Sequence, residues 1–167
     1  YEQAHFDSDQ AITGLMARDL AHLQGFPLYF YGQRYLLAVE AWLAAPFLLL
    51  LGTSVAALKL PVLLLNAAAV TLLVWLLARD GGLRPGAALI ASLFFALPPP
   101  VSASRLVEAA GCNIEPFVFV PLLWLLRARP FWFGVTLAIA TLTREFAMYA
   151  ATALAVIAIA EGRYRIP

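Results

Sequence analysis

Residues 60–78, LPVLLLNAAAVTLLVWLLA, form a run without a single charged side chain. The run is close to the ~20 apolar residues with which an α-helix crosses the ~30 Å hydrocarbon core of a bilayer. The rest of the chain agrees, because 63% of its 167 residues are hydrophobic and 13% are charged, against about 45–50% and 25% in soluble domains. We therefore predict an all-α membrane protein, and the formal net charge of +1 indicates no nucleic-acid partner.

Further uncharged runs extend the pattern to about five spans in a polytopic transmembrane helical bundle. The predicted membrane helices are 59–78, 85–104, 114–127, 130–143 and 146–161, of which the last three are short for independent spans. Residues 41–58 are also uncharged, and they either cross the membrane or lie at its interface. Residues 1–167 are interpreted as a single membrane domain.

The arginines orient this arrangement. Five crossings place one group of arginines on the same side of the membrane: Arg79, Arg84, Arg127, Arg129, Arg163 and Arg165. The positive-inside rule makes that side cytoplasmic. If residues 41–58 lie along the interface, residues 1–58 form an extracytoplasmic loop that carries half of the ten acids. We expect a multi-pass protein of the inner or plasma membrane.

Residues 6–20, FDSDQAITGLMARDL, place two acids before an amphipathic helix. The apolar positions of that helix recur at helical spacing, which predicts a juxtamembrane helix on the membrane surface; they are Ile12, Leu15, Met16, Leu20 and Leu23. Asp7 and Gln10 have the spacing of a capping box, so Asp7 is either the helix cap or a catalytic acid. Asp9 is either a solvated acid of the first turn or a functional base.

The same stretch, followed by FPLYFYGQRYLLAVEAWLAAPFLLLLG at 26–52 and SVAALKLP at 54–61, resembles the first extracytoplasmic loop of the GT-C glycosyltransferases. The likeness is to bacterial members related to protein O-mannosyltransferases and aminoarabinose transferases. It runs through essentially the whole chain, but such enzymes are much longer. The resemblance therefore implies an N-terminal fragment, and it implies that the segment matching 36–52 lies along the membrane.

This resemblance implies a sugar transfer from a polyprenyl-phosphate donor to an acceptor on the extracytoplasmic face, with membrane lipid as surroundings. Asp9 takes the position of the family's active-site acid, with Asp7 as the supporting or capping acid. Gln10 stands where a Glu is common, and its amide can orient a substrate but supplies no second charge. The resemblance leaves a divalent cation possible as a cofactor. The sequence itself shows no pattern of metal-binding residues.

Other polar residues of the outer side complete the candidate site. Arg105 and Arg144 are candidates to hold the donor phosphate, since guanidinium groups make paired contacts with phosphate. Glu115 is either a substrate contact or a structural loop acid. Tyr31 and Gln33 are either interface anchors or contacts to the sugar.

Two other classes of protein remain open. A polytopic transporter or flippase-like protein would carry ionisable residues within its spans and paired internal repeats. A truncated, non-catalytic GT-C-like module would lack the helices that enclose the substrates. The clustering of charges in loops, and the lack of a convincing repeat, favour the enzyme.

Overall fold

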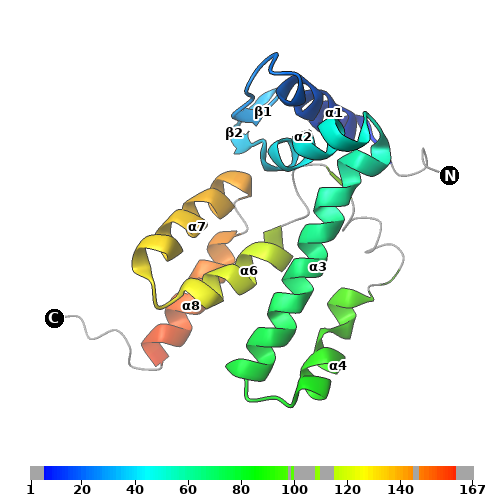
Figure 1. Ribbon diagram of the computed structural model, residues 1–167. Helices are drawn as coiled ribbons and strands as arrows, with labels where there is room; N and C mark the ends of the chain where they lie inside the picture. Colours follow the sequence, from blue (N-terminus) through cyan, green and yellow to red (C-terminus); the bar gives the residue numbers. More distant parts are fainter. Residues whose placement is uncertain (1–5, 98, 100–107, 110–114, 145–146, 161–167) are drawn as a thin grey trace.

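Helices dominate the architecture of the chain. The computed structural model describes residues 6–97, 99, 108–109, 115–144 and 147–160. Their regular structure is α-helical apart from one short β-hairpin, so the predicted all-α class is confirmed. Figure 1 shows helices α1 and α2 and the hairpin at one end of the molecule, with helix α3 leading away from them.

Helix α1 (Ser8–Ala21) and helix α2 (Val39–Leu51) pack against each other at that end. Three of the five buried residues of α2 are alanines, and small residues let two helix backbones approach closely. The buried residues of α1 are Gln10, Thr13, Met16 and Ala17, and those of α2 are Glu40, Ala41, Ala44, Ala45 and Leu48.

The predicted apolar stripe of α1 is therefore only partly the buried face. Met16 is fully buried, but the side chains of Leu15 and Leu23 are 46% and 88% exposed. The face that α1 buries is rotated away from the predicted stripe, which turns Leu15 outward, and Leu23 lies beyond the end of the helix at Ala21. The outward leucines remain suited to a membrane surface.

A β-hairpin joins the two helices, and it was not predicted. Strand β1 (Tyr29–Phe30) pairs antiparallel with strand β2 (Gln33–Leu37). The turn between them needs a positive φ, which Gly32 adopts at 86°. The aromatic residues of this segment, interpreted from the sequence as interface anchors, thus also form a small sheet.

Helix α3 (Val55–Arg79) has 25 residues and begins before the uncharged run. Its start is extended because the hydroxyl of Ser54 accepts a hydrogen bond from the Ala57 N–H at 3.1 Å. At 1.5 Å per residue the helix is about 37 Å long. Among the described residues it is the one helix whose length and composition suit a membrane crossing.

A tight turn follows α3 and leads into helix α4 (Pro85–Ala96), which packs along α3 (Figure 1). Gly81 is required there, since a Cβ would lie 2.6 Å from the carbonyl oxygen of Leu77. Gly82 adopts a positive φ of 66°. Helix α4 ends at Ala96, just before a run of prolines that cannot supply helical N–H groups, and most of the remainder of the predicted helix over 85–104 lies outside the described residues.

Three shorter helices complete the described chain: α6 (Glu115–Leu126), α7 (Pro130–Thr143) and α8 (Ala147–Ala160). Their bounds lie within one residue of the predicted ones. Helix α6 contacts α3, α7 and α8, so it joins the last two helices to the central one. These helices are apolar but have only 12–14 residues, and a bundle of five spans therefore belongs to the proposal below.

Candidate functional site

Asp7 is the N-cap of α1. Its side-chain oxygen accepts a hydrogen bond from the Gln10 N–H at 3.0 Å, and its carbonyl accepts from the Ala11 N–H at 3.1 Å. This bond satisfies one of the N–H groups that an α-helix leaves without an intrahelical partner. The capping interpretation of Asp7 is confirmed, and a structural role now accounts for this acid.

Asp9 is exposed in the first turn of α1. Its carboxylate makes no hydrogen bond or ion pair with another described residue, although its backbone carbonyl accepts a bond from the Thr13 hydroxyl at 3.1 Å. Since an α-helix turns about 100° per residue, Asp9 lies within roughly 40° of both Thr13 and Met16 around the axis. Asp9 is thus exposed at the edge of the face of α1 that buries Gln10, Thr13 and Met16.

Gln10 faces the protein rather than an open site. Its side chain is 1% exposed and belongs to the buried face of α1, next in line to Thr13. A direct contact between its amide and a substrate would require the elements that cover it to move. The structure therefore gives Gln10 a place in the helix interface, which the interpretation as a substrate contact did not anticipate.

Tyr31 and Gln33 lie at the exposed tip of the hairpin. The Tyr31 hydroxyl donates a hydrogen bond to Asp19 at 3.3 Å, and its backbone N–H contacts the sulfur of Met16 at 3.5 Å. Asp19 is ten residues after Asp9, or about 15 Å along the helix axis. The hairpin tip is therefore at the other end of α1 from Asp9, and the structure does not bring these candidates together.

Glu40 is an ionisable group that the sequence interpretation left without a role. It is 2% exposed in the first turn of α2, and its Oε1 atom has no hydrogen-bond partner among the described residues. Burial raises the pKa of Glu40 from 4.5 to about 7, and its own backbone N–H and the charge of Arg144 oppose part of that rise. Buried acids with such pKa values are typical of functional sites.

A sequence signal for Glu40 existed. It is the only acid between Asp19 and Asp80, inside an otherwise apolar helix. An isolated acid of this kind is expensive to bury, and it is retained where it has a partner or a function.

Arg144 follows α7 as its C-cap and is half-buried. Helix α7 lies against strand β2, and this packing brings Arg144 close enough for its charge to act on Glu40. The two groups are more than 100 residues apart in the sequence. We call the packed pair of α1 and α2 the α1–α2 layer. Arg144 is the predicted site residue that reaches this layer from a helix far away in the sequence.

The remaining candidates, Arg105 and Glu115, come from the stretch between α4 and the first turn of α6. Arg105 lies outside the described residues, and Glu115 begins α6 with a side chain that lies outside them too. Between them, Glu108 is 8% exposed, and its neighbour Ala109 packs in the same core as Met16. This contact brings residues 108–109 against the core that α1 and α2 share.

Among the described residues, no three His, Cys, Asp or Glu side chains come together in a way that could hold a metal ion. Comparisons with protein-family models, with curated proteins and with solved structures find no match for this chain. The site therefore rests on its own geometry: an exposed Asp9 beside a layer that buries Glu40 and contacts both Arg144 and the segment around Glu108.

Proposed function

We propose that this protein is a membrane glycosyltransferase that moves a sugar from a polyprenyl-phosphate carrier to an acceptor on the extracytoplasmic face, with Asp9 as base or electrostatic stabiliser. The state of Asp9 carries the proposal. Asp7 already caps α1, and the Asp9 carboxylate is exposed and makes no contact with another described side chain. It is free to meet a substrate.

The residue types suit the reaction. Glycosyl transfer passes through an oxocarbenium-like state, in which a carboxylate can take the acceptor's proton or stabilise the positive charge. The leaving phosphate needs cations, and Arg144 is the described candidate near the α1–α2 layer. Arg105 is proposed for the same role from the sequence.

Exposed apolar side chains support the membrane placement. We place α3, α4, α6, α7 and α8 across the bilayer and α1 and α2 on its extracytoplasmic surface. Large hydrophobic side chains stand exposed along these helices, among them Leu63, Leu64, Trp75, Leu89, Ile90, Phe131, Trp132, Ile139, Val156 and Ile159. Such extended apolar surfaces are typical of contact with lipid. Because 12–14 residues cover only about 20 Å, flanking residues or a thinned bilayer complete the shorter spans.

The test is donor consumption, which needs no knowledge of the acceptor. Membranes that contain the protein are incubated with polyprenyl-phosphate mannose or polyprenyl-phosphate aminoarabinose labelled in the sugar, and loss of label from the carrier is followed. Asp9→Asn should slow consumption by roughly a hundredfold or more, the usual contribution of a general base.

Asp19→Asn is the matched control, since it removes another acid from the same helix at the far end. It should leave consumption near the wild-type rate. If Asp9→Asn remains folded and consumes donor at the wild-type rate, Asp9 is not the catalytic acid. If the wild-type protein consumes neither donor, the proposed sugar transfer from these carriers is wrong.

Buried Glu40 is the observation that favours a second candidate, a transporter or flippase. An ionisable group within an apolar helix is common on transport pathways. In that case Glu40→Gln would abolish substrate movement in proteoliposomes, Asp9→Asn would have little effect, and no donor would be consumed. The exposed Asp9 carboxylate has no role in a transport mechanism, so we place the transporter second to the glycosyltransferase.

A further inference from the structure

A polar cluster joins the ends of α3 and α6, far along α3 from the candidate site. The indole N–H of Trp124 donates to Oδ2 of Asp80 at 3.0 Å, and Arg127 contacts the same oxygen at 2.9 Å. The Arg79 Nε atom lies 3.6 Å from Oδ1. The Trp124 hydrogen bond, and then the neighbouring arginines, lower the pKa of Asp80, so it is ionised at neutral pH.

Both arginines of the cluster also lie over tryptophan rings. Arg79 is 4.7 Å from the ring centre of Trp75, and Arg127 is 4.3 Å from that of Trp124. Their side chains stay 59% and 30% exposed. A guanidinium group has five N–H donors. Arg127 also donates to the carbonyl of Trp124 at 2.8 Å, and each arginine still keeps donors for a further anion.

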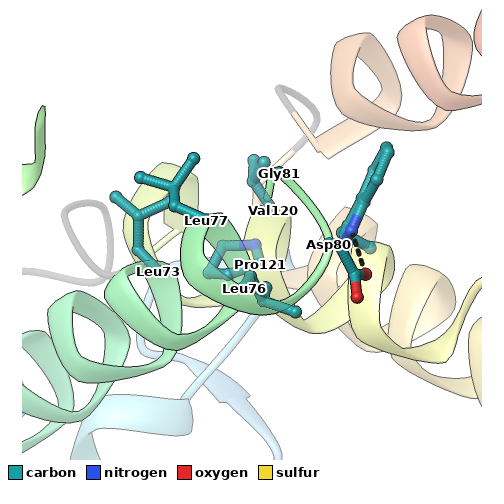
Figure 2. Close-up of a pocket in the computed structure, with 8 residues that line it drawn as sticks. Leu73, Leu76, Leu77, Asp80, Gly81, Val120 and Pro121 are labelled. Atoms are coloured by element: carbon teal, nitrogen blue, oxygen red, sulfur yellow. Dashed lines mark hydrogen bonds between the residues drawn. The ribbon is translucent and has the colours of Figure 1, made fainter. Parts of the chain in front are cut away.

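An apolar groove of about 410 Å³ leads to this cluster. Figure 2 shows leucines of α3 together with Val120 and Pro121 of α6, and the carboxylate of Asp80 with its hydrogen bond beside them. The groove's lining from α3 is Leu73, Leu76 and Leu77, and its lining from α6 is Val120, Pro121 and Trp124. The groove thus has an apolar length and a charged end.

Positive charge exceeds negative charge at that end. The Asp80–Arg127 ion pair brings two loops together, residues 79–84 and 127–129, which carry four arginines and one aspartate. Arg84 and Arg129 are exposed and make no ion pair with any described residue. Neither side chain caps the helix that follows it, so both are available to a ligand.

We propose that the groove between α3 and α6 binds an anionic phospholipid. Its acyl chain would lie along the leucines, and its phosphate would contact the arginine rim, the four arginines of residues 79–84 and 127–129. The inference rests on the membrane placement proposed above but not on the sugar-transfer activity. Charge complementarity selects the occupant: an apolar slot with an arginine rim at one end matches a molecule with an apolar chain and a negative head. Basic pockets between membrane helices on the cytoplasmic side are suited to such headgroups.

The experiment measures lipid binding directly. The purified protein in detergent is titrated with phosphatidylglycerol or with phosphatidylcholine, and bound lipid is counted by native mass spectrometry. We expect tighter binding of phosphatidylglycerol. Replacing Arg84 or Arg129 with Gln should weaken it about fivefold each, and the double variant roughly twenty-five-fold, since each surface arginine contributes on the order of 1 kcal/mol to anionic lipid binding.

Three control variants test whether the lipid binds at this groove. Arg18→Gln removes an exposed arginine from α1, at the other end of the protein, and should leave binding unchanged. Val120→Trp fills the groove while keeping every charge, and should weaken both phosphatidylglycerol binding and its dependence on Arg84. Asp9→Asn should bind phosphatidylglycerol like the wild type, so a failure of the glycosyltransferase proposal is distinguishable from a failure of this one.

Four outcomes would overturn the proposal. Equal binding of the two lipids would remove the anionic preference, and equal effects of Arg84→Gln and Arg18→Gln would move the site elsewhere. Stronger binding of undecaprenyl phosphate than of phosphatidylglycerol would assign the groove to a different lipid. A dimer that excludes lipid and is broken by Val120→Trp would assign it to a second copy of this chain.

Discussion

The α1–α2 layer and the α6–α8 helices bury their apolar residues in different ways. The first region has a protein core, in which Met16, Phe30, Leu36 and Leu48 pack with the start of α3. The buried cluster of the second region is small and consists of Phe119, Ala140 and Ala147. Its larger apolar side chains are mostly exposed.

The difference shows what each region needs from its surroundings. The α1–α2 layer encloses its own core, so its stability comes from contacts within the chain. The α6–α8 helices leave many large apolar side chains exposed, and in the membrane placement proposed above lipid would cover them. The region that carries Asp9 and Glu40 is thus the better packed of the two within the chain itself.

The largest expected effect compares two methionines. Met16 is fully buried and Met148 is 50% exposed. Met16→Ala should lower the free energy of unfolding by about 2–5 kcal/mol, because it leaves a cavity, whereas Met148→Ala should change it by less than about 0.5 kcal/mol. Denaturant titration in detergent micelles checks both. Similar losses for the two variants would mean that the regions do not differ in packing.

The next effect concerns Glu40 and pH. Its folded-state pKa of about 7 lies above 4.5, so the folded protein holds a proton that the unfolded chain releases. The free energy of unfolding should therefore fall as the pH rises from about 4.5 to about 7, by roughly 3 kcal/mol in total. Glu40→Gln should remove this dependence, while Asp19→Asn should keep it. Thermal unfolding in micelles across that pH range is the measurement, and a flat wild-type profile would contradict the assignment.

The smallest effect separates the two acids that open α1. Asp7→Ala should cost about 1 kcal/mol of stability, since it removes the side chain that caps the helix. Asp9→Ala should cost only about 0.3–0.5 kcal/mol, the weaker end of the helix-dipole contribution. Donor consumption should respond in the opposite order, with the larger loss in Asp9→Ala. If the variant that loses more stability also loses more activity, the division of roles between Asp7 as cap and Asp9 as catalytic acid is wrong.

Local patterns predicted much of the fold. Runs without charge predicted α7 to the residue and α6 and α8 to within one, and the spacing from Asp7 to Gln10 predicted the cap of α1. The hairpin escaped prediction because its two strands are very short and its turn depends on the positive φ of Gly32.

The site was harder to predict than the helices. Gln10 was placed with the substrate because its position resembles that of a family acid, but close packing of α1 on α2 buries it. Tyr31 was placed there too, and the hairpin directs its hydroxyl to Asp19 instead. Both of these positions are set by contacts between elements, which local spacing does not report.

By itself, the sequence determined where most of the apolar helices form and supplied a cap candidate, Asp7, for the first one, because helix formation and capping depend on residues within a few positions of each other. Only the tertiary structure decided which polar groups meet. The packing of α7 on β2 brings the charge of Arg144 to Glu40, and the packing of α6 on α3 brings Arg127 to Asp80. Such pairs depend on the energy of burying small and apolar faces together, and that energy belongs to the whole fold rather than to any one segment.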